Sequence, residues 1–208
     1  MNKLIVIILL FISSICQATP LQKNLQHIEH DWAIAYYGTA KAKQETAYIQ
    51  LMTQTEQLLQ QYPNNSEVLF YLAMIKASMA EHEGAMNALE QVTEARDLLN
   101  KVIELNPKTM NGSAYVILGT LYYRVPAWPI AFGDNQLAEK MFQTALTINP
   151  NGIDSNYFYG KFLLANDKTA EAKQHFEKAL AAPIRTEQTY SDEQLKAETK
   201  RVLQSLEL

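Results

Sequence analysis

The feature that most constrains the fold of this chain is a helical pattern of small residues that recurs ahead of its prolines. The positions five, eight and twelve residues before Pro150 hold Ala145, Phe142 and Ala138. Pro107 and Pro63 follow looser versions of the pattern, and the unit before Pro183 repeats it one residue out of step. Small residues let helices approach closely, and one repeat cannot bury its apolar face alone. The chain is therefore expected to fold as a stack of repeated helical units.

Hydrophobic periodicity divides the chain from Pro20 onward into helical segments. Apolar residues recur at i, i+3, i+4 and i+7, and we find no stretch that alternates with a period of two. The predicted helices span 21–37, 40–61, 66–82, 85–105, 112–124, 135–148, 155–166, 169–181 and 191–206. The connections are mostly two to six residues long, which makes successive helices antiparallel. The predicted fold class is all-α, with antiparallel helical hairpins stacked as an α-solenoid.

Polar residues mark several of the expected helix starts. Ser66, Asp134 and Asp154 are placed to cap the helices that follow them. Ser191 with Gln194 fits a capping box at the start of the last helix.

The first eighteen residues have the pattern of a secretory signal peptide. Lys3 precedes nine apolar residues, and Cys16 and Ala18 form a small-x-small end. The apolar run is too short for a membrane span, which needs about 20 residues. We expect cleavage after Ala18, a mature chain without cysteine, and a periplasmic or secreted protein with no membrane span. The alternative is a lipid anchor on Cys16.

The spacing of small residues resembles that of the tetratricopeptide repeat (TPR), a 34-residue helix–turn–helix unit. Within 153–186, Ala172 follows Gly160 by twelve residues, Phe176 follows Ala172 by four, and Ala179 follows Phe176 by three. The resemblance implies a TPR-like α-solenoid with a concave groove. The predicted organisation is 1–18 signal peptide, 19–65 N-terminal helical hairpin, 66–186 TPR-like repeats and 187–208 C-terminal capping helix.

An apolar insertion replaces the tight turn that an ordinary repeat has after Arg124. The segment Val-Pro-Ala-Trp-Pro-Ile-Ala-Phe-Gly leads into Asp134 and is about seven residues longer than that turn. We expect Trp128, Ile130 and Phe132 to fold back and plug the hairpin interface. The alternative is an exposed patch for assembly or partner binding. The candidate residues of this insertion loop are Pro126, Trp128, Pro129, Phe132, Gly133 and Asp134.

A narrower resemblance rests on this insertion and the helices around it. The run 118–134, the pattern Ala138, Phe142 and Ala145, and the later runs 149–154 and 156–160 resemble a group of exported bacterial TPR proteins. These are similar to the T-component of TRAP-type transporters, a periplasmic partner of solute-binding proteins. The resemblance covers roughly 66–206. T-components usually carry a double glycine before the aspartate, whereas here Phe132 precedes Gly133.

The TPR resemblance also implies which residues line the groove. Carried onto this chain, the groove positions are Val116, Thr120, Tyr123 and Arg124 in one repeat, and Asp154, Tyr157, Lys161 and Leu164 in the next. Tyrosine offers a large contact area at low entropic cost. Arg124 and Lys161 are expected to recognise acidic or carboxylate groups.

Composition and motifs narrow the function classes. The formal net charge of −4 leaves no basic excess, so no nucleic-acid partner is expected. The sequence carries no Gly-rich phosphate loop, no Gly-x-Ser-x-Gly motif and no cysteine pair, so we expect no enzyme and no cofactor. We expect the carboxylates near the C-terminus, Asp192 among them, to lie on solvated helix faces.

One small cluster of candidate metal ligands lies on the first predicted helix. It comprises His27, Glu29, His30 and Asp31, and the two histidines are three residues apart. One helix face could therefore hold a metal. The cluster lacks the i, i+4 histidine pair of a zinc-protease helix, so a solvated face is the expected reading and a metal-binding protein stays an alternative.

The sequence thus predicts an exported TPR-like interaction or scaffold module. It would bind a protein or peptide partner in the groove, and the narrower resemblance implies a periplasmic solute-binding protein as that partner. A small-ligand carrier with an apolar cavity is the alternative, and an oligomer remains open.

Overall fold

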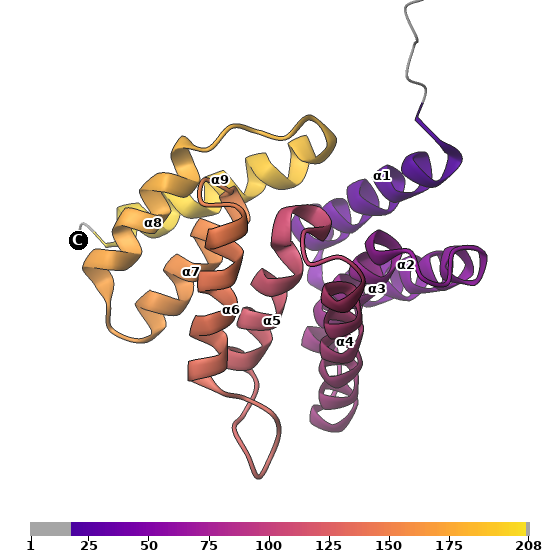
Figure 1. The fold of residues 1–208 in the computed structure, drawn as a ribbon, viewed down its shortest axis with the longest axis horizontal. Helices are drawn as coiled ribbons and strands as arrows, with labels where there is room; N and C mark the ends of the chain where they lie inside the picture. Colours follow the sequence, from indigo (N-terminus) through magenta and orange to yellow (C-terminus); the bar gives the residue numbers. More distant parts are fainter. Residues whose placement is uncertain (1–17, 207–208) are drawn as a thin grey trace, which may run out of the picture.

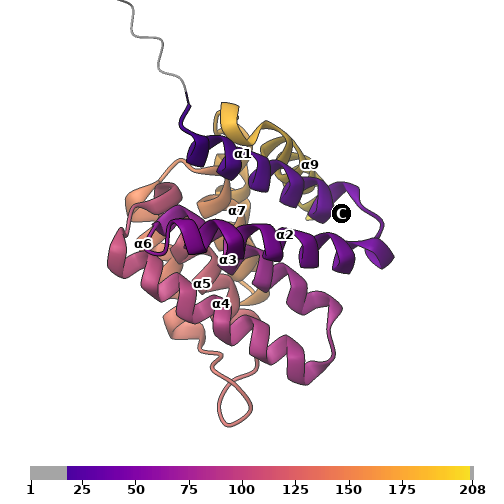
Figure 2. The ribbon, with the colours of Figure 1, turned by 90° about the vertical axis from the view of Figure 1, so that its right-hand side faces the viewer.

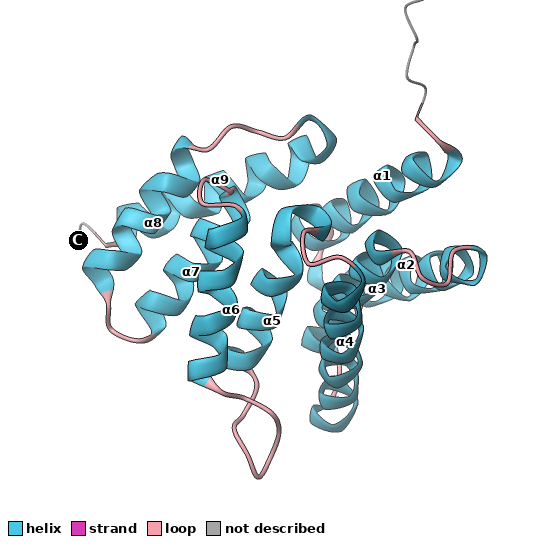
Figure 3. Cartoon of the chain, viewed as in Figure 1, coloured by secondary structure: helices cyan, strands magenta, loops and turns pink. Residues whose placement is uncertain are grey.

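Residues 18–206, which the computed structural model describes, form a series of helices joined mostly by short loops (Figures 1 and 3). The signal-peptide and Cys16 predictions lie outside this part of the chain, apart from Ala18. The long helices are α1 (Pro20–Ala33), α2 (Lys41–Gln61), α3 (Ser66–Met79), α4 (Ala85–Leu105), α5 (Ser113–Arg124), α6 (Asn135–Ile148), α7 (Ile153–Ala165), α8 (Thr169–Ala181) and α9 (Thr189–Ser205). Short helical turns are η1 (Ile34–Gly38), η2 (Ala80–His82), η3 (Thr109–Gly112) and η4 (Thr186–Gln188).

The helices pack as consecutive antiparallel hairpins. The most extensive contacts join α3 to α4, α5 to α6 and α7 to α8, and α2 packs against α3. In Figure 1 the hairpins follow one another from the indigo end of the chain to the yellow end. The predicted all-α class and the stacked hairpins are therefore confirmed.

The predicted repeat register is confirmed by contacts between paired helices. A Cβ built on Gly119 would lie 2.9 Å from Cε2 of Phe142, and one on Gly160 would lie 2.8 Å from Cε1 of Phe176. Each glycine therefore lets a phenylalanine of the next helix lie directly against the backbone. Ala172, like its counterparts in α6, is fully buried. The small residues ahead of the prolines are thus the places where helices touch.

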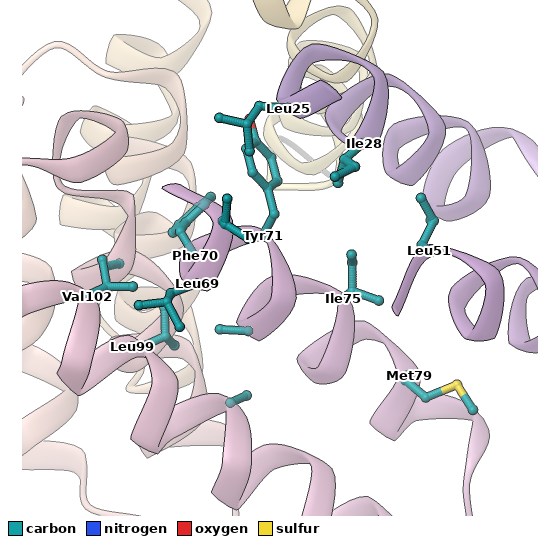
Figure 4. Close-up of a cluster of buried hydrophobic side chains, with 14 of the residues drawn as sticks. Leu25, Ile28, Leu51, Leu69, Phe70, Tyr71, Ile75, Met79, Leu99 and Val102 are labelled. Carbon is teal, nitrogen blue, oxygen red and sulfur yellow. The ribbon is translucent and has the colours of Figure 1, made fainter. Parts of the chain in front are cut away.

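Two apolar clusters form the core. One joins α1–α5, and Figure 4 shows Leu25 and Ile28 of α1 lying above Tyr71 and Ile75 of α3. The other lies within α5–α9 and is built around Phe142 and Phe176. Burial of these side chains is the main driving force that holds the stack together.

Three of the expected helix caps are wrong. Asn65, not Ser66, caps α3, because its side chain accepts from the backbone N–H groups of Glu67 and Val68. Asp154 lies inside the first turn of α7, after Gly152 at the N-cap. The predicted box of Ser191 and Gln194 falls within α9, which begins at Thr189. Which polar residue stands at a helix N-cap depends on the backbone path between the helices, and the sequence pattern does not show that path.

The cap at Asp134 is confirmed. Its Oδ1 accepts from the backbone N–H groups of Gln136 at 2.8 Å and Leu137 at 3.0 Å.

The first predicted helix changes form before its end. The α-helical part stops at Ala33, and the wider π-helical turn η1 follows. The side-chain amide of Gln44 donates to the carbonyls of Ala35 and Tyr36, both at 2.9 Å. These bonds tie the π-turn to the first turn of α2. Such π-turns frequently occur at functional sites.

The two ends of the stack meet, which the sequence did not predict. α1 and α9 are in direct contact, and Figure 2 shows α9 behind α1. Ser191 Oγ donates to Oε1 of Glu29 across 2.6 Å. A Cβ on Gly38 would lie 2.9 Å from Oη of Tyr190, so the π-turn also approaches α9 closely. The hairpins therefore curve until the first helix touches the last.

A bulky residue at a predicted contact position tests the repeat register. Ala172→Leu should lower the free energy of unfolding by about 1–3 kcal/mol in urea denaturation, because the added side chain overpacks a closed layer. Ala170→Leu is the matched control, since Ala170 is an exposed residue of the same helix. Equal effects of the two substitutions would contradict the register.

Candidate functional site

The curved stack encloses a cavity of about 500 Å³. Its walls come from α1, η1, α3 and α4 on one side and from α5, α7 and α9 on the other. Most of the lining side chains are apolar, among them Phe70, Met74, Val92 and Ile117. Small-molecule sites typically enclose about 300–1,000 Å³ and have mainly apolar walls. The cavity therefore has the size and character of a ligand site.

The lining of the cavity has an exposed end and a buried end. The exposed members of its lining gather at η2, the first turn of α4 and the insertion loop: they are Glu81, Ala85, Arg124, Pro126 and Ile130. At the other end the lining includes the fully buried Asp192 and the nearly buried Glu29. We call the exposed end the mouth and the buried end the floor.

The floor is organised by Arg185, in the connection between α8 and α9. Its guanidinium binds both oxygens of Asp154, at 3.0 and 2.8 Å, and both oxygens of Asp192. The Arg185 backbone N–H also donates to Asp192 across 2.7 Å. Burial alone would lower the pKa of Arg185, but the two carboxylates outweigh burial and raise it. The arginine is therefore fixed as a cation between two anions.

Glu29 lies beside this network, and fewer charged or hydrogen-bonding partners offset the cost of burying its carboxylate. Burial raises the pKa of the Glu29 carboxyl, and the hydrogen bond from Ser191 offsets this only in part. Glu29 was expected on a solvated face, and so was Asp192. Both expectations are wrong, because contact between α1 and α9 excludes water from both carboxylates.

An aromatic cluster on α1 and η1 forms one wall. The rings of Trp32 and Tyr36 stack with centroids 5.2 Å apart, and Tyr37 meets both edge-on. The indole Nε1 of Trp32 donates to Oγ of Ser78 across 3.0 Å, which fixes the ring against α3. Burial raises the pKa of Tyr36 to about 12, so its hydroxyl is neutral at physiological pH.

The structure divides the predicted groove residues into two groups. Val116, Thr120, Arg124 and Asp154 line the cavity, whereas Tyr123, Tyr157, Lys161 and Leu164 do not. Tyr123 packs edge-on against Phe162, with ring centroids 5.7 Å apart. The hydroxyl of Tyr157 donates to Glu198 across 3.2 Å.

The two basic groove residues also separate. Arg124 reaches the mouth and pairs with Glu81 across 3.0 Å. Lys161 lies outside the cavity lining. They therefore do not share this cavity as a joint site for a carboxylate.

The expectation that the insertion loop plugs the hairpin interface is wrong for two of its three apolar side chains. Trp128 is 86% exposed and Ile130 is 71% exposed. Phe132 does fold back, since its ring packs edge-on against Tyr122 and lies 4.5 Å below the guanidinium of Arg96. In Figures 1 and 3 the loop projects beyond the ends of α5 and α6.

The neck of the loop explains this projection. The backbone N–H of Gly133 donates to the carbonyl of Pro126 across 2.9 Å, and that of Asp134 donates to Tyr122 across 2.8 Å. A Cβ on Gly133 would lie 1.9 Å from the carbonyl oxygen of Val125, so only glycine fits there. The closed neck holds Trp128 and Ile130 outward.

The candidate metal ligands on α1 diverge. His27 Nε2 lies 3.2 Å from Asp31 on the exposed side, His30 meets Tyr190 edge-on, and Glu29 faces the cavity floor. In the part of the chain that the structure describes, no group of three His, Cys, Asp or Glu side chains is arranged to hold a metal ion.

The sequence gives no sign that the residues that make the cavity polar belong to one site. These are Glu29, Trp32, Tyr36, Arg185 and Asp192. Glu29 and Trp32 share a helix face by spacing, but neither motif nor period links them to Arg185 or Asp192. Contact between the ends of the chain brings them together.

Comparison with known proteins gives a family and two structural likenesses. A family model described as "TRAP transporter T-component" matches residues 30–198. Two solved structures titled "Crystal structure of MamA" and "Crystal structure of MamA protein" share 19% and 18% identity with this chain, with TM-scores of 0.47 and 0.45. The first match covers 80% of this chain and 90% of the matched chain, and the second covers 88% of this chain and 91% of the matched chain. No curated protein sequence matches. Among residues 18–206, no helix is long and apolar enough to cross a membrane.

Removing the Glu29 charge tests the electrostatics of the floor. A carboxyl whose pKa is raised by folding contributes stability below its unfolded pKa, near 4.5, and loses it as pH rises through the folded pKa. Glu29→Gln keeps an oxygen to accept from Ser191 and should therefore unfold at higher urea than the wild type at pH 7. The difference should shrink toward pH 4.5. A variant less stable at pH 7 and equal at pH 4.5 would contradict the assignment.

Proposed function

The chain belongs to the TRAP transporter T-component family, and from this membership we propose that it is a periplasmic interaction module that binds the solute-binding protein of a TRAP-type transport system. Residues 1–18 would direct export, and the mature chain would begin at Thr19. In this proposal the protein is a binding component without an enzymatic reaction or a cofactor of its own.

The observation that carries the partner proposal is the exposed apolar loop at the cavity mouth. Trp128 and Ile130 project from a neck that backbone hydrogen bonds and Gly133 hold in place. Exposed tryptophans presented on a rigid support are common binding hot spots, because they bury a large area with little loss of entropy. A partner that covers this loop would also cover the mouth.

The charges at the mouth favour a partner contact dominated by apolar burial. Arg124 and Glu81 neutralise one another across 3.0 Å, and both side chains are substantially exposed. An acidic partner would have to compete with Glu81 for Arg124, which weakens the sequence-based expectation for this arginine. Binding should therefore depend only weakly on salt, since paired exposed charges steer association little.

Truncation of the loop tip tests this proposal. The probe is a purified solute-binding protein of a TRAP-type system from the same organism, with affinity measured by calorimetry. Trp128→Ala should weaken binding at least 30-fold, in keeping with loss of about 2 kcal/mol at a hot spot, and should leave the melting temperature unchanged because Trp128 is 86% exposed.

Ile49→Ala is the matched control, since Ile49 is an exposed apolar residue on α2 and lies outside the cavity lining. Retention of full affinity by Trp128→Ala, or equal losses in both variants, would place the partner on another surface.

A further inference from the structure

We propose that the cavity binds a small amphiphile whose cationic amine or ammonium head lies at the floor and whose apolar body extends toward the mouth. This inference goes beyond the partner contact proposed above, and it holds whether or not a protein docks at the insertion loop. It rests on the charges, the free oxygen, the aromatic wall and the apolar lining of the cavity.

The charged residues of the lining are unequally divided. Four are acidic and two are basic: Glu29, Glu81, Asp154 and Asp192 against Arg124 and Arg185. Both arginines are already paired, Arg124 with Glu81 and Arg185 with two aspartates. An anionic head would have to break one of these pairs and would meet the remaining carboxylates. A cationic head finds an excess of negative charge and displaces nothing.

Glu29 provides the specific contact for such a head. Its side chain is only 5% exposed, and Oε1 accepts from Ser191. No hydrogen bond reaches Oε2 from the residues that the structure describes, and Oε2 is not among the buried atoms without a partner, so it is open to solvent. Glu29 lines this cavity and also a second hollow beside α1 and η3. Burying a charge is costly unless it is paired and hydrogen-bonded. A cationic head at Oε2 would supply the missing counter-charge, and a protonated amine would supply a donor as well.

The aromatic wall begins one helical turn further along α1. Trp32 follows Glu29 by three residues and lines the cavity, with its ring held by the bond from Nε1 to Ser78. Tyr36 stacks on the indole. Aromatic faces beside a carboxylate attract ammonium groups through the ring quadrupole, and quaternary ammonium ligands are recognised in this way. The wall therefore favours a cationic head, as the Glu29 carboxylate does.

The rest of the lining suits an apolar body. Beyond the aromatic wall, the sides are formed by Phe70 and Met74 of α3, Val92 of α4 and Ile117 of α5. The side chains of Met74 and Ile117 are half-buried, as they would be if they faced an open space within the stack. The volume of about 500 Å³ leaves room for a chain or ring system attached to the head.

Trp32 serves as a built-in reporter for the test. The sequence has two tryptophans, so Trp128→Phe leaves Trp32, which lines the cavity, as the sole tryptophan, and excitation at 295 nm selects it over the tyrosines. The protein is titrated with decyltrimethylammonium and, separately, with decanoate, both below their micellar concentrations and without any partner protein. We expect saturable 1:1 binding of the ammonium probe, at least tenfold tighter than decanoate. Equal or tighter binding of decanoate, or no saturable response to either probe, would overturn the proposal.

Two variants separate the Glu29 charge from its surroundings. Glu29→Gln should weaken decyltrimethylammonium at least tenfold and leave decanoate unchanged or tighter. Ser191→Ala removes the hydroxyl but keeps the carboxylate, so it should retain the preference for the cation. Equal losses for both probes in Glu29→Gln, or loss of the preference in Ser191→Ala, would contradict the assigned contact.

A third variant tests the location without altering any charge. Ala77 lines the cavity from α3, and Ala77→Leu fills part of the space. Binding of decyltrimethylammonium, measured by calorimetry on the otherwise wild-type protein, should fall at least tenfold. Unchanged binding would place the probe outside the cavity. Since none of these titrations includes a partner, their failure is distinguishable from failure of the solute-binding-protein interaction.

Discussion

Ser191 of α9 donates a hydrogen bond across 2.6 Å to the buried carboxylate of Glu29 on α1, and this bond joins the two ends of the helical stack. Nearby, Arg185 ties the first turn of α7 to α9 through Asp154 and Asp192. Taking such charges out of water costs several kcal/mol per ion, which only good pairing geometry offsets. Closure of the stack thus places a charged network at the floor of an otherwise apolar cavity.

The contacts that lie within one hairpin could be predicted from the sequence. Gly119 against Phe142 and Gly160 against Phe176 are contacts within one repeat, so a fixed spacing records them. Contacts between the ends leave no such record. Glu29 and Ser191 are 162 residues apart in the chain, and no period relates them. The polarity of the cavity, which depends on that contact, was therefore beyond sequence reasoning.

The insertion loop shows a second limit. Its apolar composition favoured burial, and Phe132 does return to the hairpin. Trp128 is held outward because backbone bonds close the neck of the loop, and composition does not reveal such bonds. The loop and the cavity differ in chemical character. The exposed apolar loop stands at the mouth, where we propose that a partner docks, and carboxylates lie at the buried end, where we propose that an amine binds.

The central claim is that α1 and α9 meet and close the stack, and a double-mutant cycle between Glu29 and Ser191 tests it most directly. The free energy of unfolding is measured for the wild type, Glu29→Ala, Ser191→Ala and the double variant at pH 7. Hydrogen bonds to charged groups contribute about 1.5–3 kcal/mol. The account predicts a coupling free energy of about 1–3 kcal/mol between the two residues. Additive effects, within about 0.5 kcal/mol, would mean that the two ends of the stack do not touch in solution.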